Sequence, residues 1–280
     1  MPPQTGSPVE GTVRLHPCGK RLVLSAYCNL TSLSRHVPER EAVCHLVRHG
    51  RRPRSYRRAI EETVEHFTGR KIGANTVQRY KNYGGFNDDW KLTHAIITDT
   101  AMEVPLSRVI EEFQNRYRGE NWDGVITEET PLISEASLQA LNTEERIMGI
   151  VTGRPEEEAE WTLDHFGWKK YFPLLVGKEK QGERPKPHPF PLNHSLTILA
   201  AAGRDVSPKE SVYIGDSVDD MEAARKAGMW AVGLVPPYVD EDEHAPLLRE
   251  RGAHLVLQDP NELPDLFNRF GEALAAHSHA

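Results

Sequence analysis

The stretch VYIGDSVDDMEAARKAGM, residues 212–229, decides the fold of this 280-residue chain. An apolar run breaks at Gly215, Asp216 follows in a loop, and a helical pattern then continues to Gly228, which is well placed as a C-cap. A strand that leads through a loop into a helix is the repeating unit of a parallel sheet covered by helices. Ligand chemistry is therefore expected at the carboxyl ends of the strands.

The same unit recurs on both sides of this stretch. Short apolar runs lie at residues 146–153, 230–235 and 253–257, and helical patterns lie between them. Short buried strands that alternate with helices are typical of parallel sheets. We therefore predict an α/β fold with a Rossmann-like parallel sheet, most of it formed by the chain from about residue 146 onward.

Residues 56–132 have a different character. Two stretches of helical spacing end at Gly69 and Gly119, and Gly84 and Gly85 interrupt the segment between them. A mostly helical block placed before the strand series predicts an α-helical cap inserted into the sheet domain.

Composition excludes several classes of partner. A net charge of -7 provides no electrostatic footprint for nucleic acid, and no apolar run approaches the roughly 20 residues of a membrane-spanning helix. The first residues lack the pattern of a secretion signal, and the three cysteines (Cys18, Cys28 and Cys44) fit neither a zinc site nor a disulfide framework. We expect a cytoplasmic protein that binds no nucleic acid and no membrane.

Three carboxylates lie close together in the deciding stretch. Asp216 follows a strand, and Asp219 and Asp220 begin the next helix, so they concentrate oxygen ligands that suit Mg²⁺. Helix capping explains one of the latter two equally well, but it does not explain Asp216.

Two further residues lie upstream in a suggestive order. Thr152 ends the apolar run at 146–153, where its hydroxyl and the following amides could bind a phosphoryl oxygen, and Lys186 could supply positive charge to the same group. Taken alone, each has an ordinary explanation as a turn residue or a solvated loop residue.

Together these segments resemble the second, third and fourth motifs of the haloacid dehalogenase-like (HAD) phosphatases, in the branch similar to phosphoglycolate phosphatase. The matching motifs are Val151-Thr152-Gly153, Lys186-Pro187 and the run from Gly215 to Asp220. The resemblance implies a HAD core formed by residues 21–55 and 133–280, a helical cap at 56–132, and a loose segment at 1–20. It also implies hydrolysis of a small phosphorylated metabolite through an aspartyl-phosphate, with Mg²⁺ as cofactor.

The resemblance also implies roles for individual residues. Asp216 would bind Mg²⁺, Asp220 would support the metal site, Thr152 would hydrogen-bond the phosphoryl group, and Lys186 would neutralise its charge. Substrate contacts are expected from the loop after Thr152 and from the cap, at Gly153, Arg154, Asn87 and Trp90. A structural turn with a buried tryptophan remains an equal explanation for the two cap residues.

The family's first motif, Asp-x-Asp-Gly, is missing. Its first Asp is the nucleophile and its second the general acid/base, yet residues 1–55 contain no Asp. The obvious strand candidate, residues 21–32, places Ala26 and Cys28 where the two carboxylates belong. We therefore expect an impaired phosphatase with a poorly packed amino-terminal region, or alternatively a non-catalytic pseudo-phosphatase that binds a phosphometabolite or a protein partner.

Residues 44–53 invite two further interpretations. Arg48, His49 and Gly50 resemble the nucleophile motif of histidine phosphatases, although no second catalytic His of that family is recognisable downstream. Codon degeneracy also allows a coding sequence for this segment that, shifted by one base, encodes Val-Ile-Leu-Phe-Asp-Met-Asp-Gly-Val. We hypothesise that residues of about 25–54 come from a shifted frame or a misplaced splice junction.

Overall fold

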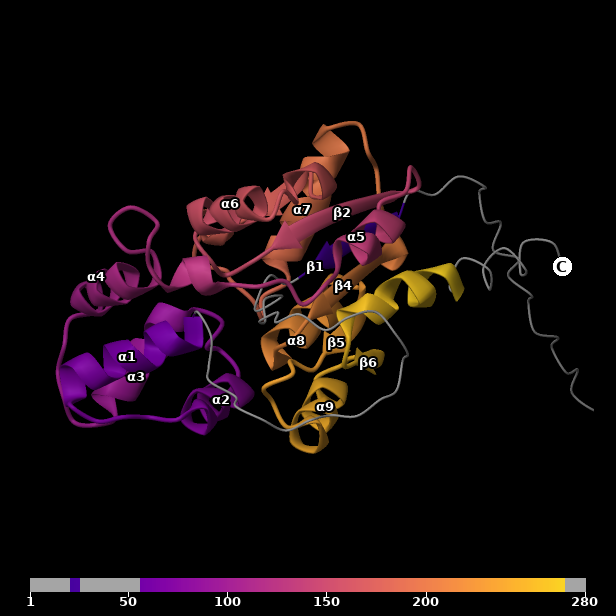
Figure 1. Cartoon of the computed structure of the whole chain (residues 1–280). Coiled ribbons are helices and arrows are strands. Elements are labelled where there is room, and N and C mark those ends of the chain that lie inside the picture. Colours follow the sequence, from indigo (N-terminus) through magenta and orange to yellow (C-terminus); the bar gives the residue numbers. More distant parts are fainter. Residues whose placement is uncertain (1–20, 26–55, 270–280) are drawn as a thin grey trace, which may run out of the picture.

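A computed structural model describes residues 21–25 and 56–269 of the chain. Within these residues, six parallel strands form one sheet in the order β3-β2-β1-β4-β5-β6 (Figure 1). The strands are β1 (Arg21–Ser25), β2 (Arg146–Val151), β3 (Leu174–Val176), β4 (Ser211–Gly215), β5 (Trp230–Leu234) and β6 (Leu255–Leu257). The prediction of an α/β fold with a Rossmann-like parallel sheet is confirmed.

The central position of the sheet is filled by β1. All five of its residues pair with β2, and four of them pair with β4. The pairing of Arg21–Ser25 on both sides counts against the expected poorly packed amino-terminal region as far as the backbone is concerned. A short β-rich run between two strands gains backbone hydrogen bonds on both sides. The predicted loose segment 1–20 and residues 26–55, with Arg48, His49 and Gly50, lie outside the described residues.

Helices cover both faces of the sheet. Neighbouring residues of a strand point to opposite faces, so each face presents apolar side chains of its own for helices to cover. Tyr213 packs into one apolar cluster together with residues of α7 (Phe190–Ala201), α8 (Val218–Ala227) and α9 (Glu241–Glu250). The next residue, Ile214, packs into the other cluster, together with residues of α5 (Glu135–Leu141) and α6 (Glu156–His165). The helix α8 ends where the sequence predicted, with Gly228 in the left-handed conformation at φ 75°.

Residues 56–129 form a helical unit beside the sheet, at the left of Figure 1, with Glu129 as the C-cap of its last helix. The unit contains α1 (Tyr56–Thr68), α2 (Ala74–Tyr83), α3 (Asp89–Thr98), α4 (Leu106–Tyr117) and the 3-10 helix η1 (Val125–Glu128). Its helices enclose an apolar cluster of their own, which includes Ile60, Leu92 and Phe113. Among the described residues, the structure has no helix long and apolar enough to cross a membrane.

Candidate active site at the carboxyl edge of the sheet

The predicted motifs meet where three neighbouring strands end. Thr152 directly follows β2, and Asp216 directly follows β4. Between them, β1 ends at Ser25, whose partners are Ile150 of β2 and Ile214 of β4. The end of β1 therefore lies between the ends of the two strands that lead into the Thr152 loop and the Asp216 loop.

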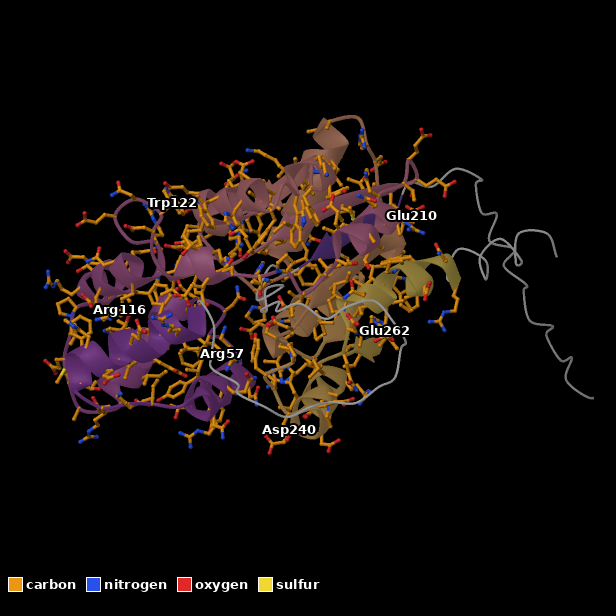
Figure 2. All side chains as sticks on the ribbon, in the orientation of Figure 1. Arg57, Arg116, Trp122, Glu210, Asp240 and Glu262 are labelled. Carbon is orange, nitrogen blue, oxygen red and sulfur yellow. The ribbon has the colours of Figure 1, made fainter. Side chains whose placement is uncertain are left out.

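Asp216 lies in a cleft between the sheet and the helical unit, with an empty volume of about 430 Å³. Burial raises the pKa of its carboxyl group to about 7, with a further contribution from Asp220, while Lys81 and Arg57 oppose the shift. Arg57, labelled in Figure 2, lines the cleft from α1. The backbone carbonyl of Asp216 lies 2.8 Å from Nε2 of the buried His244, so α9 helps to fix this loop.

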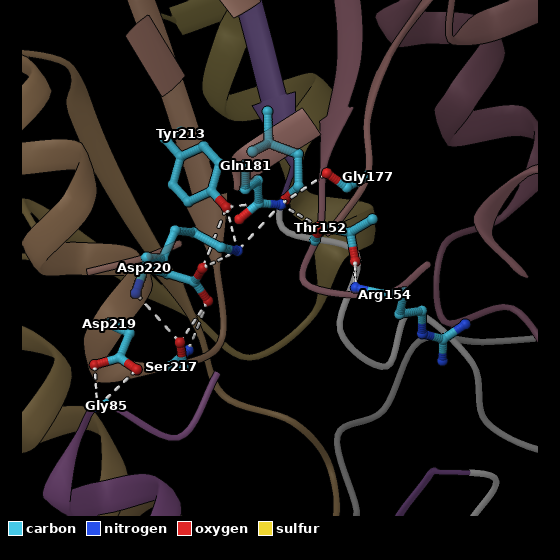
Figure 3. Close-up of polar contacts among 11 residues, drawn as sticks. Gly85, Thr152, Arg154, Gly177, Gln181, Tyr213, Ser217, Asp219 and Asp220 are labelled. Atoms are coloured by element: carbon cyan, nitrogen blue, oxygen red, sulfur yellow. Dashed lines mark hydrogen bonds and ion pairs between the residues drawn. The ribbon is translucent and has the colours of Figure 1, made fainter. Parts of the chain in front are cut away.

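Asp220, labelled in Figure 3, forms a buried ion pair with Lys186. Lys186 Nζ donates to Asp220 Oδ1 at 2.6 Å and to the Tyr213 hydroxyl at 2.8 Å, and the Lys186 side chain is fully buried. The other carboxylate oxygen of Asp220 accepts from the backbone N–H and the hydroxyl of Ser217, at 3.1 and 2.7 Å. Asp220 thus caps α8 and neutralises Lys186, and these contacts fix both side chains.

Thr152 is fully buried and turns the chain after β2. Its backbone N–H continues the ladder to Val176, 3.0 Å away, and its hydroxyl oxygen accepts from the Arg154 amide at 3.2 Å. Gln181 donates to the Thr152 carbonyl from the far side of the loop. The loop is therefore rigidly held in the position where the sequence predicted a phosphoryl contact.

Arg154 points away from Asp216 into a buried polar network. Its guanidinium pairs with Glu129 at 2.8 Å and stacks over the Tyr56 ring, 4.4 Å from the centroid. The Tyr117 hydroxyl donates to the same Glu129 carboxylate at 2.8 Å. Arg154 also borders a second cleft, beside the loop that follows β2. Its guanidinium charge, however, is already paired with Glu129.

Asn87, Trp90 and Gly153, the other predicted substrate contacts, border that second cleft, whose empty volume is about 260 Å³. A Cβ atom added to Gly153 would lie 2.7 Å from Asn87 Nδ2, so glycine permits the loop between α2 and α3 to approach the loop after β2. Lys178 lies 3.6 Å from the centroid of the Trp90 ring. The structure thus brings together the four predicted substrate contacts, and Asn87 also borders the Asp216 cleft.

The family model of the haloacid dehalogenase-like hydrolases matches residues 55–234. This chain belongs to the haloacid dehalogenase-like hydrolase family. The match contains the loops with Thr152, Lys186 and Asp216 and all four helices of the helical unit, so the resemblance seen in the motifs is confirmed.

Several of the curated relatives of this chain are named as phosphoglycolate phosphatases. The chain is 33% identical over 189 residues to an imidazoleglycerol-phosphate dehydratase of Phytophthora nicotianae, covering 65% of this chain and 40% of that protein. It is 38% identical over 127 residues to a phosphoglycolate phosphatase of Xylella fastidiosa, covering 43% of this chain and 49% of the relative. The chain thus spans about half the length, or less, of these curated relatives.

Solved structures agree with the HAD fold. A predicted phosphoglycolate phosphatase from Haemophilus somnus superposes with a TM-score of 0.61 at 18% identity, covering 89% of this chain and 98% of that one. This likeness establishes the fold, with helices and a parallel sheet in the same arrangement.

The described residues of this HAD chain provide only part of a ligand set for a Mg²⁺ ion. Asp216 is a partly buried carboxylate whose raised pKa reflects unfavourable burial of negative charge, which a cation would relieve. Asp219 and Asp220 are held by Gly85 and Lys186, and no group of three metal-binding side chains is present within the described ranges. Among the described carboxylates at this edge of the sheet, Asp216 is therefore the one that we consider for Mg²⁺ binding.

Sequence reasoning missed the residues that join the helical unit to the sheet. Glu158 of α6 accepts hydrogen bonds from the Tyr56 hydroxyl and from Gln114, 2.7 Å away. Asp219 accepts from the Gly85 amide, although the sequence suggested for it only helix capping or a place in a carboxylate group suited to Mg²⁺. A charged residue on an otherwise buried helix face, as at Glu158, is the local signal that could have indicated such a contact.

Proposed function

We propose that this chain is a Mg²⁺-dependent phosphatase scaffold that binds a small phosphate monoester, with turnover impaired because the nucleophile is absent. The observation that supports this most is the convergence of the Thr152 loop and the Asp216 loop on both sides of the end of β1. In a parallel sheet, this edge is where ligands bind. The relatives named as phosphoglycolate phosphatases favour a small phosphorylated metabolite as the ligand.

Each motif residue has a role in this proposal. The Thr152 hydroxyl and the backbone amides that follow it bind the phosphoryl oxygens. Lys186 contributes positive charge while it stays paired with Asp220. Asp216 holds Mg²⁺, which when bound would neutralise charge on the phosphoryl group. Asp220 supports this arrangement by fixing Lys186 and the start of α8.

We also propose that the helical unit acts as a cap over this edge. Both clefts lie between the unit and the sheet, and Asn87 borders each of them. Such a position suits residues that select a ligand by its non-phosphate part, so Asn87 and Trp90 are our candidates for this role. A cytoplasmic location remains our expectation.

The impairment follows from the chemistry at the end of β1. Ala26 follows Ser25, and no Asp occurs in residues 1–55, so no Asp there can form an aspartyl-phosphate. The family match begins at residue 55, which is consistent with a shifted frame or misplaced splice junction across residues of about 25–54. The missing Asp also favours the second candidate function, a non-catalytic pseudo-phosphatase that binds a phosphometabolite or a protein partner.

Phosphate release by the purified chain tests the proposal, using Mg²⁺ and a panel of phosphate monoesters, with ligand binding measured in parallel. We expect binding that Asp216→Ala weakens, and little or no turnover. Asp205→Ala, a change at an exposed carboxylate in the loop before β4, serves as the control and should leave binding unchanged.

Three outcomes would count against this account. Turnover that Asp216→Ala abolishes would show that the missing Asp does not matter. Absence of binding would reject the phosphate site. Turnover without metal that depends on His49 would instead favour the histidine-phosphatase interpretation.

A further inference from the structure

Asp219 connects the start of α8 to the helical unit. Both of its carboxylate oxygens lie 2.9 Å from the backbone nitrogen of Gly85, in the loop between α2 and α3 (Figure 3). The side chain is well buried, with Asp219 only 3% exposed. Because the Asp219 carboxylate is buried and accepts from the Gly85 amide, this hydrogen bond attaches the loop to the start of α8 in a defined direction.

The backbone of the loop is shaped for this attachment. Gly84 has φ +83°, and a Cβ atom there would lie 3.0 Å from Asp219 Oδ1. The conformation and the close approach both favour glycine at this position. The loop therefore comes within hydrogen-bonding range of α8 because residue 84 has no side chain.

Residues 84–88, which we call the strap, are attached to the sheet edge at three points. Gly85 binds Asp219 after β4, Asn87 lies against Gly153 after β2, and Asp88 pairs with Lys178 after β3 at 2.6 Å. The strap thus extends across the carboxyl ends of the strands that carry the predicted phosphate-binding loops. Asn87 is one of the two residues between the attachments at Gly85 and Asp88.

We propose that Asp219 is a positioning residue, which holds the strap so that Asn87 lies over the Thr152-Gly153 loop and contacts the non-phosphate part of a bound monoester. This inference rests on the proposed phosphate site. Asp219 itself touches no reacting group in this arrangement.

A purely local role for Asp219 makes a different prediction. A carboxylate in the first turn of a helix stabilises that helix through its charge, whatever lies opposite. Asp219→Asn removes the charge but keeps an oxygen that can accept from the Gly85 amide, whereas Asp219→Ala removes both. The two variants therefore separate attachment of the strap from stabilisation of α8.

Hydrogen exchange of the full chain, measured by mass spectrometry, tests the attachment. In Asp219→Ala we expect amides of the strap to exchange about tenfold faster, while Asp219→Asn stays within about threefold of the wild type. Equal effects of both variants, confined to the first turn of α8, would overturn the attachment.

Calorimetric titration with Mg²⁺ tests the consequence for ligand binding, using 2-phosphoglycolate and inorganic phosphate as probes. We expect Asp219→Ala to weaken 2-phosphoglycolate about fivefold while phosphate binding is unchanged, as the loss of one hydrogen bond would. Asn87→Ala should reproduce this effect, and the double variant should add nothing to it.

Two results would overturn the positioning role. Equal weakening of both probes, or additive effects of the two substitutions, would show that Asp219 does not act through Asn87. If the wild type binds neither probe, the phosphate site and the positioning role both fail, while the exchange experiment still decides whether Asp219 holds the strap.

Discussion

The helical unit and the sheet are each filled by apolar side chains, whereas the boundary between them combines an aromatic stack, Trp122 on Trp161 at 5.7 Å, with hydrogen bonds and ion pairs. Ile60, Leu92 and Phe113 lie inside the unit, and the sheet has an apolar cluster on each face. Across the boundary, Arg154 pairs with Glu129, and Asp219 accepts from Gly85. Apolar burial therefore explains which residues pack within each part, and directional polar contacts together with the aromatic stack explain how the two parts are oriented.

The largest effect should come from the ion pair inside the sheet part. Lys186→Met leaves Asp220 buried without its cation, which we expect to cost about 3 to 5 kcal/mol in the free energy of unfolding. Urea denaturation measures this loss. Lys226→Met is the control, since Lys226 pairs with Glu222 at 2.7 Å while half exposed, and its removal should cost less than about 1 kcal/mol. Similar losses for both variants would contradict a special role of burial.

A slightly smaller effect is expected at the boundary. Arg154→Met leaves Glu129 buried and should cost about 3 kcal/mol, near the low end of this range because Tyr117 still donates to the carboxylate. Adding Glu129→Gln removes the unpaired charge and should restore part of the stability in the same urea experiment. A double variant as unstable as the single one would indicate that lost packing, rather than the unpaired charge, causes the effect.

The boundary should also weaken as the pH rises. Burial raises the pKa of Glu158 above 4.5, although hydrogen bonds from Tyr56 and Gln114 oppose the shift. Because the folded state holds this proton more tightly, its stabilising contribution is present below about pH 4.5 and is lost as the pH rises through the folded-state pKa.

The glutamine variant tests this sign. The stability of Glu158→Gln relative to the wild type should increase between about pH 4 and pH 8, because glutamine does not ionise. Urea titrations at several pH values measure it, and Glu160→Gln, at an exposed position of the same helix, should show no such trend. A constant difference for Glu158→Gln would contradict the buried, unfavourable carboxylate.

The smallest effect should come from an exposed contact at the same boundary. Glu157 pairs with Arg118 at 3.1 Å, but the Glu157 side chain is 62% exposed. Removing it by Glu157→Ala should change the free energy of unfolding by no more than about 0.5 kcal/mol. A loss comparable to that of Arg154→Met would show that charge alone, without burial, holds the boundary.

Local patterns in the sequence were sufficient for the fold and for the positions of the motifs. The strand runs that end at Val151 and Gly215 and the glycine stops at Gly69 and Gly228 were readable because each depends on neighbouring residues. The resemblance to the HAD phosphatases then placed Thr152, Lys186 and Asp216 at one edge, and the structure brings their loops together there.

Contacts between distant segments were not predictable in this way. Gly85 and Asp219 are 134 positions apart, and no periodicity links them. The pairing of β1 on both sides was also not expected. The prediction of poor packing rested on the absence of an Asp-containing motif, which says nothing about whether Arg21–Ser25 can bond to two neighbouring strands. Backbone hydrogen bonding does not depend on the catalytic side chain that the strand normally delivers.

Repair of the amino-terminal segment tests the central claim most directly. Replacing residues 44–53 with Val-Ile-Leu-Phe-Asp-Met-Asp-Gly-Val supplies the missing carboxylates on an apolar run, which we expect to take the central position between β2 and β4 in place of Arg21–Ser25. Phosphate release from a monoester with Mg²⁺ is the measurement. We predict that the repaired chain hydrolyses the ester, that changing the first new Asp to Asn abolishes this activity, and that Asp216→Ala does the same. A repaired chain as inactive as the present one, or a present chain that is already active through Asp216, would contradict the account.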